Sequence, residues 1–212
     1  MMDKDELVQI ITKMVKETIA GNDKTLVPVG VSGRHVHLTR EHMDILFGED
    51  SALTKKKELM GGQFAAEECV TILGAKLSSM EKVRILGPLR KESQVEISKT
   101  DSIKLGIKAP TRDSGQIENS APITLVGPKG AIVLNQGCIV AKRHIHMSIE
   151  DGIKFGIENN QIVNVKVPGE RGGLLGNVLV RTDRTYTLEM HIDTDEASAM
   201  EIKCGSLLEI VK

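Results

Sequence analysis

The amino-acid sequence contains one short motif twice, and this duplication constrains the fold more than any other feature. Residues 34–39 read Arg-His-Val-His-Leu-Thr, and residues 143–148 read Arg-His-Ile-His-Met-Ser. The offset is 109 positions (143 − 34), about half of the 212-residue chain, and Glu41 and Glu150 follow the two copies at the same distance. We therefore expect two similar units, each led by a strand that runs into a short helix.

The duplication also predicts where the chain divides into domains. A boundary near each copy makes residues 34–141 one domain, which carries the first His-x-His pair. The second domain is then discontinuous. It combines residues 23–33 with residues 142–212, and it carries the second pair.

Residues 1–22 form a separate segment in this interpretation. From Asp3 to about Ala20, apolar residues recur at helical spacing with charges between them, and Gly21-Asn22 follows as a stop signal. The apolar positions are Leu7, Ile10, Ile11, Met14, Val15 and Ile19. The pattern predicts an N-terminal amphipathic helix, which either packs on the rest of the protein or binds a partner.

The remainder of the chain indicates mainly β structure with short helices. Short segments rich in Val, Ile and Leu are separated by Gly and Pro, which favours barrels over a doubly wound sheet. The expected strands lie around 69–73, 82–86, 94–98, 123–127, 131–134, 161–167 and 174–181. Short helices are expected at 39–47, 100–106, 148–156 and 194–200, each beginning near a Ser, Thr or Asp that can cap it.

Composition excludes several classes of function. The net charge is −1, from 28 basic and 29 acidic residues, and only four residues are aromatic, so a nucleic-acid partner is not expected. No apolar run approaches the roughly 20 residues that span a bilayer, and no signal peptide is present, so we expect a soluble protein inside the cell. The three cysteines form no C-x-x-C pair and are interpreted as small residues of the core in a reducing compartment.

The two His-x-His pairs predict metal binding. Side chains alternate across a strand, so the two imidazoles of each pair, His35 with His37 and His144 with His146, point to the same face. His191 follows another alternating segment and is a fifth candidate, whereas His42 is interpreted as a surface residue. Neutral imidazole suits zinc, and the histidines with a carboxylate would supply two sites of three protein ligands each.

Basic residues near strand turns are candidates for binding an anion. Arg90 follows Gly87-Pro88-Leu89, a tight turn that would hold it at the rim of a strand. An arginine fork matches the geometry of phosphate. Each of these residues can equally be a solvated surface charge, and the further candidates are Lys57, Arg84, Arg112 and Arg143.

The chain resembles the phosphate propanoyltransferases, the zinc-dependent phosphotransacylases of bacterial microcompartments. The resemblance covers nearly the whole chain through several stretches of specific sequence. These are Val29 to Leu38, Gly62 to Glu67, Leu86 to Arg90, Gln94 to Ser98 with Thr100-Asp101, Ala109 to Gly115, Arg143 to Ser148, and Leu188 to Ala197.

The resemblance implies two β-barrel domains capped by short α-helices, with the active site between them. One zinc would be held by His35, His37 and Glu96, and a second by His144, His146 and His191. Arg90 matches the phosphate-binding arginine of the family. The positions that match its coenzyme A pocket are Ser32, Lys57, Arg84 and Leu86.

The resemblance also implies the reaction and the setting. An acyl-CoA, with propanoyl-CoA first among the candidates, and phosphate would give acyl phosphate and coenzyme A by direct phosphate attack. Family members are usually homodimers. Many carry an N-terminal helix that directs them to shell or cargo proteins of a microcompartment in the bacterial cytoplasm, of the kind that degrades propanediol.

Other functions remain open at this point. A dinuclear zinc hydrolase would use the same ligands to activate water, and a metal-binding module of a compartment would turn over nothing. A covalent acyl-enzyme would need Ser114 or Cys138 as its nucleophile. The preferred acyl chain is also open.

Overall fold

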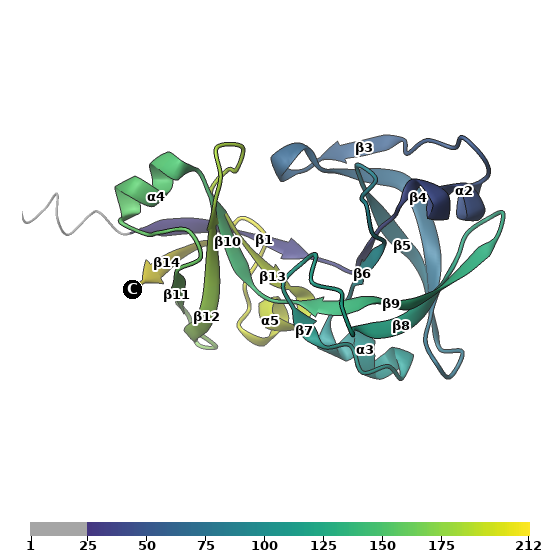
Figure 1. Ribbon diagram of the computed structural model, residues 1–212. Coiled ribbons are helices and arrows are strands. Elements are labelled where there is room, and N and C mark those ends of the chain that lie inside the picture. The colour runs from purple at the N-terminus through teal and green to yellow at the C-terminus, as the bar shows by residue number, and fades with distance from the viewer. Residues whose placement is uncertain (1–24) are drawn as a thin grey trace, which may run out of the picture.

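The computed structural model describes residues 25–212, so the expected N-terminal helix lies outside the described residues. The described chain is mainly β with four short α-helices, and its strands form two barrels that lie side by side (Figure 1). No helix of the described residues is long and apolar enough to cross a membrane.

The first barrel closes through six strands in the order β4-β5-β2-β6-β9-β8, because β8 pairs with both β9 and β4. Two further strands belong to this barrel: β3 pairs with β4, and β7 pairs with β9. Their bounds are β2 His35–His37, β3 Lys55–Glu58, β4 Phe64–Leu73, β5 Ser79–Gly87, β6 Gln94–Glu96, β7 Thr111–Arg112, β8 Ala121–Val126 and β9 Ala131–Ala141. A short 3-10 helix, Met60–Gly62, separates β3 from β4.

The second barrel closes through six strands in the order β1-β13-β10-β12-β11-β14. Its first strand comes from the start of the described chain and the other five from the end. Their bounds are β1 Leu26–Ser32, β10 His144–Met147, β11 Ile162–Val167, β12 Gly173–Thr182, β13 Glu189–Asp193 and β14 Leu207–Val211.

The two barrels share one pattern of strand pairing. In the first, β2 runs parallel to β5 and antiparallel to β6, and in the second, β10 runs parallel to β12 and antiparallel to β13. Likewise β6 is parallel to β9, and β13 is parallel to β1. The expected fold class of two β-barrels with short helices is confirmed. The proposed division near residues 34 and 142 stays a prediction.

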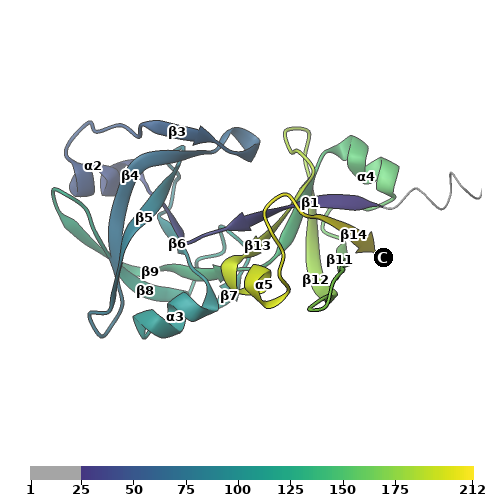
Figure 2. The ribbon, with the colours of Figure 1, turned by 180° about the vertical axis from the view of Figure 1, so that it is seen from behind.

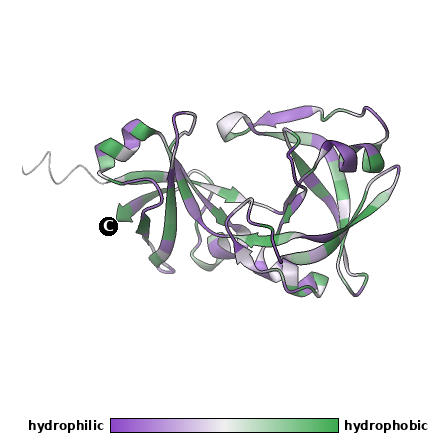
Figure 3. Ribbon diagram, viewed as in Figure 1, coloured by the Kyte–Doolittle hydropathy of each residue, from purple (hydrophilic) through white to green (hydrophobic). Residues whose placement is uncertain are grey.

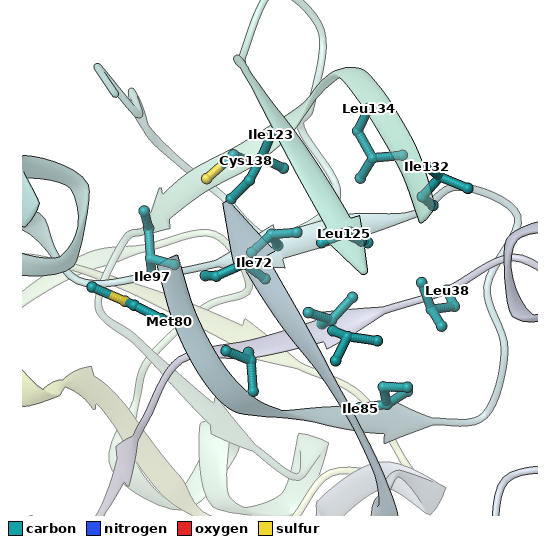
Figure 4. Close-up of a cluster of buried hydrophobic side chains, with 14 of the residues drawn as sticks. Leu38, Ile72, Met80, Ile85, Ile97, Ile123, Leu125, Ile132, Leu134 and Cys138 are labelled. Atoms are coloured by element: carbon teal, nitrogen blue, oxygen red, sulfur yellow. The ribbon is translucent and has the colours of Figure 1, made fainter. Parts of the chain in front are cut away.

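Each barrel has its own hydrophobic core. Strand alternation places Val, Ile and Leu inside, and Figure 4 shows part of the first core, with Leu38, Ile85 and Cys138 among its members. A separate cluster that includes Ile145, Val180 and Met190 fills the second barrel. Hydrophobic stretches alternate with hydrophilic loops along the ribbon in Figure 3. Only Cys138 fits the expectation of core cysteines, because Cys69 is half-buried and Cys204 is exposed.

The four helices occur at the expected places. They are α2 Arg40–Phe47, α3 Lys99–Leu105, α4 Ile149–Phe155 and α5 Thr194–Ala199. The side chains of Thr39, Ser98, Ser148 and Asp193 accept backbone hydrogen bonds and cap their N-termini. Helices α3 and α5 meet at the junction of the barrels (Figure 2), where the Thr100 amide donates to Asp195 at 2.7 Å.

Candidate metal centres and active site

Both His-x-His pairs lie where the chain passes from one barrel to the other. Strand β1 of the second barrel ends at Ser32, and β2 of the first begins at His35. Strand β9 of the first barrel ends at Ala141, and β10 of the second begins at His144. The two crossings of the chain between the barrels therefore bring both pairs to the junction.

The first cluster consists of His35, His37 and Glu96. Glu96 on β6 lies opposite His35 on β2 in the strand register. The Nε2 atom of His35 is 3.5 Å from Glu96 Oε2, and that of His37 is 4.0 Å from Glu96 Oε1. One ligand atom from each of the three residues lies within 4.8 Å of the others, which is a spacing that one metal ion can bridge.

Two of the three residues of the first cluster, His37 and Glu96, favour the forms that bind a cation. For His35, burial opposes protonation, but the charge and hydrogen bond of Glu96 outweigh it and raise the pKa. Burial, with the neighbouring charges of His35 and Arg90, lowers the pKa of His37 to about 3, so this ring is neutral. Burial alone would raise the pKa of Glu96, but interactions with His35 and His37 outweigh it and keep that pKa well below its usual range. A neutral imidazole and an ionised carboxylate are the forms that bind zinc.

Hydrogen bonding leaves part of the first cluster unsatisfied. The Nδ1 atom of His35 lies 2.9 Å from the Gly33 carbonyl, which leaves Nε2 free to face Glu96. The Nδ1 atom of His37 is buried and has no hydrogen-bond partner among residues 25–212. Buried polar atoms are rarely left unpaired, so the ring fits a metal site better than a purely structural role.

Further polar side chains form hydrogen bonds around Glu96. The sequence analysis did not assign them a role in supporting this carboxylate. Gln94 Nε2 donates to Glu96 Oε1 at 2.6 Å, and Ser114 Oγ donates to the same oxygen at 2.7 Å. The guanidinium of Arg90 lies next to Ser114, with Nη1 3.5 Å from Ser114 Oγ and Nη2 3.4 Å from Gln63 Oε1. Arg90 also lines a pocket with Lys91, Glu92, Gln94, Gly115 and Ile117.

The second cluster consists of His144, His146 and His191. The three ring centroids lie 4.7–5.1 Å apart, and the ring of Tyr186 stacks on His146 at 4.2 Å. The Nδ1 atom of His144 lies 2.9 Å from the Lys142 carbonyl, which repeats the bond between His35 and Gly33. Among residues 25–212, only the first cluster brings three ligand atoms within 4.8 Å of one another.

Two histidines of the second cluster, His144 and His146, favour the neutral form. Burial is the largest cause that lowers the pKa of His144. Burial, with the charges of His144 and His191, lowers the pKa of His146 to about 3. Glu189 is the nearby carboxylate, with Oε2 3.2 Å from Nε2 of His191, and this interaction lowers its pKa against the opposing effect of burial.

The two clusters are structurally equivalent. His191 lies opposite His144 in the same way that Glu96 lies opposite His35. The two residues are 95 positions apart (191 − 96), and each stands two residues before the cap of a helix, Ser98 or Asp193. The shared distance to a capping residue is the one sequence signal for Glu96, and its meaning is clear only once the strands are paired.

Equivalent ion pairs tie each cluster to its helix. Arg34, which precedes His35, donates to both oxygens of Asp101 at 2.7 and 2.8 Å. Arg143, which precedes His144, donates to Glu196 at 2.7 Å and to the Gly176 carbonyl at 2.8 Å. These bonds use Nε and Nη1 of Arg143 within the protein, which makes the phosphate-binding role considered for it less favoured.

The other predicted basic residues have different environments. The Arg84 guanidinium donates to the carbonyls of Ala66 and Glu67, and Arg112 donates to the Thr111 carbonyl. Lys57 is exposed on β3. His42 is half-buried rather than a surface residue, because its Nδ1 lies 2.7 Å from Ser93 Oγ.

Three of the four residues expected to line a coenzyme A pocket lie on β3 and β5, which flank β4, and the fourth, Ser32, lies on β1 of the other barrel. Arg84 is opposite His35 in the strand register, and Leu86 is two residues further along β5 on the same face. Lys57 and Leu86 both lie opposite Ala65 of β4. Ser32 ends β1, where it lies opposite Asp193.

Charges of the first barrel act on residues of the second. Burial is the main cause that lowers the pKa of His144, and the charge of Glu96 opposes it. The hydrogen bond with His191 is the main cause that lowers the pKa of Glu189, and the charge of Lys57 contributes to it.

The structure gives the covalent alternative little support. Burial raises the pKa of Cys138 to about 12, so its thiol stays protonated and unreactive at neutral pH. Ser114 donates its hydroxyl proton to Glu96, a residue that the first cluster already uses. Arg90, whose Nη1 lies 3.5 Å from Ser114 Oγ, cannot act as a base because its guanidinium remains protonated.

Comparison with known proteins gives consistent matches. A family model described as phosphate propanoyltransferase matches residues 28–203. A phosphate propanoyltransferase of Lachnoclostridium phytofermentans is 56% identical over 98% of this chain and 100% of its own length. A protein of that name from Rhodobacter capsulatus is 46% identical over 96% of this chain and 96% of its own length. Another from Thermotoga maritima is 50% identical over 87% of this chain and 88% of its own length.

Proposed function

The chain belongs to the phosphate propanoyltransferase family and is thus an acyltransferase that uses an acyl-CoA and phosphate, and we propose that it performs the transfer at two zinc ions held between its barrels. The observation that carries this proposal is the contact chain from Arg90 through Ser114 to Glu96, which supports a phosphate site at Arg90 because it connects a guanidinium to the first cluster. Propanoyl-CoA is the proposed acyl donor.

The residues of the two clusters fit the proposed metal. His35, His37 and Glu96 would hold one zinc, and His144, His146 and His191 the other. Imidazole nitrogens with one carboxylate are typical zinc ligands, and three protein ligands leave a position for substrate. When bound, zinc would polarise the thioester carbonyl and favour departure of the thiolate.

Arg90 is the proposed phosphate-binding residue. Burial lowers its pKa, but a guanidinium remains protonated, so the side chain offers a cation to the phosphate dianion. The backbone amide of Arg90 donates to the Leu38 carbonyl at 2.8 Å, which fixes the residue next to the strand that carries His37. Phosphate held there is oriented for direct attack on the thioester carbon.

Coenzyme A would bind along Ser32, Lys57, Arg84 and Leu86. Leu86 offers apolar contact, whereas Lys57 and Arg84 offer positive charge to the phosphates of the cofactor. These residues extend from the first cluster across β5 and β4 to β3. The thioester end would therefore lie near His35 and the nucleotide end further out.

The proposed setting is a microcompartment in the bacterial cytoplasm, such as one that degrades propanediol. Residues 1–22 would bind shell or cargo proteins, because their apolar stripe matches the type of helix that docks in a hydrophobic groove. The protein would act as a homodimer.

One incubation tests the reaction. The purified full chain is mixed with propanoyl-CoA with and without phosphate, thiol release is followed with a thiol reagent, and acyl phosphate is trapped with hydroxylamine. Phosphate-dependent thiol release with an equal amount of acyl phosphate is expected. Release that does not need phosphate would identify a hydrolase instead, and a series of short acyl-CoA substrates measures the preferred chain.

A further inference from the structure

The position two residues before Glu96 and before His191 carries a polar side chain in both barrels. Gln94 and Glu96 share one face of β6, and Glu189 and His191 share one face of β13, since residues two apart on a strand point the same way. Gln94 lies opposite His37 in the strand register, and Glu189 lies opposite His146. The two positions are therefore equivalent.

In the first barrel this position holds the carboxylate in place. Gln94 is buried, and its Oε1 accepts a hydrogen bond from the Gly115 amide at 2.8 Å. That bond directs Nε2 toward Glu96, to which it donates at 2.6 Å. An amide N–H is the appropriate partner for an ionised carboxylate, which can only accept.

In the second barrel the hydrogen-bond donor and acceptor exchange positions. The equivalent of Glu96 is an imidazole, His191, and the equivalent of Gln94 is a carboxylate, Glu189, with Oε2 3.2 Å from Nε2 of His191. This Nε2 is buried and has no aligned hydrogen bond in the described part of the chain. A carboxylate can only accept, so it complements a ring N–H.

The backbone leaves room for the Glu189 carboxylate at this place. Gly30 of β1 lies opposite His191 in the strand register. A Cβ at Gly30 would come within 3.0–3.2 Å of three atoms of the Glu189 carboxyl group. The absence of a side chain at residue 30 therefore allows the carboxylate to stay against His191.

We propose that Glu189 is a positioning residue that accepts a hydrogen bond from Nε2–H of His191 and so fixes the tautomer in which Nδ1 keeps its lone pair for the metal. Gln94 performs the equivalent task for Glu96 as a donor. The inference rests on the proposed zinc binding. Such outer partners fix the orientation and basicity of metal-ligating histidines.

Zinc affinity is the measurement that tests this role. The full chain is stripped of metal and titrated with zinc against a chelating indicator, and cobalt(II) spectra report the geometry of each site. Glu189→Ala should weaken one of the two zinc sites about 10–100-fold and leave the other unchanged. Glu189→Gln should weaken it less, because the amide oxygen still accepts a hydrogen bond.

Two further variants make the result specific. Gly30→Ala should also weaken that site, because its Cβ displaces the carboxylate without removing it. Glu189→Ala should add nothing in a His191→Ala background. Glu170→Ala, at an exposed acid of the same barrel, should leave both affinities unchanged.

The outcomes separate this inference from the proposed function. Two zinc sites of unchanged affinity in folded Glu189→Ala and Glu189→Gln, with folding checked by circular dichroism, would overturn the role of Glu189 while leaving the metal sites intact. A parent protein that binds fewer than two zinc ions would overturn the metal assignment itself, and the role of Glu189 with it.

Discussion

Glu96 lies opposite His35 across two antiparallel strands, with its Oε2 3.5 Å from Nε2 of the histidine. His191 occupies the same place relative to His144 in the other barrel. One backbone arrangement thus presents a carboxylate in one cluster and an imidazole in the other, so the two ligand types should be interchangeable at this position.

Glu96→His should retain metal at the first site, whereas Glu96→Ala should lose most of it. A histidine at this position reproduces the three-imidazole arrangement expected of the second cluster, and alanine removes the ligand. Zinc content after dialysis, measured by elemental analysis, checks both variants. Equal metal content in the histidine and alanine variants would contradict the equivalence of the two positions.

His35→Ala and His144→Ala should each remove one of the two metal ions proposed for the chain, because each removes one of three protein ligands. Most of the activity should be lost in both variants. The measurement is the zinc-to-protein ratio of each purified variant beside the parent protein. Two metals retained in both variants would refute the ligand assignment.

Arg90→Ala should raise the KM for phosphate or strongly lower kcat without changing the zinc content. Arg90→Lys should rescue only part of the activity, because an ammonium lacks the planar fork of a guanidinium. Steady-state kinetics with phosphate varied at saturating acyl-CoA checks this prediction. Kinetics like those of the parent protein would remove Arg90 from the site.

Arg34→Ala should lower the free energy of unfolding by about 1–3 kcal/mol, because it leaves the carboxylate of Asp101 buried without its charged partner. Arg40→Ala is the matched control, since Arg40 pairs with Asp44 on an exposed helix surface and should cost at most about 0.5 kcal/mol. Chemical denaturation measures both. A loss for Arg34→Ala no greater than the control would show that the pair adds little stability.

Deletion of residues 1–22 should preserve acyl transfer and the melting temperature while abolishing co-localisation with shell proteins. The reason is that no residue of either cluster lies in that segment. Activity assays, thermal melts and fluorescence microscopy of tagged protein make the comparison. A truncated protein that unfolds or loses activity would place the segment in the core.

Local patterns in the sequence were sufficient to predict much of the secondary structure of this protein. The four helices were predicted because capping residues and helical signals act within a few positions of each other, as at Ser148 and Asp151. The strands around residues 82–86 and 161–167 were predicted from runs of Val and Ile bounded by turn residues. The duplicated Arg-His-x-His motif correctly indicated two similar units.

The tertiary structure decided which residues meet. The contact of Glu96 with His35, the support of Glu96 by Gln94 and Ser114, and the pairing of Arg143 with Glu196 join residues on different strands, helices or loops. The chain crosses between the barrels from β1 to β2 and from β9 to β10, and these two crossings likewise bring both clusters to one junction. Alternation along a strand fixes only the face to which a side chain points, whereas the register between strands is set by closing each barrel around its core. That closure depends on residues throughout the chain, so no local pattern could have specified it.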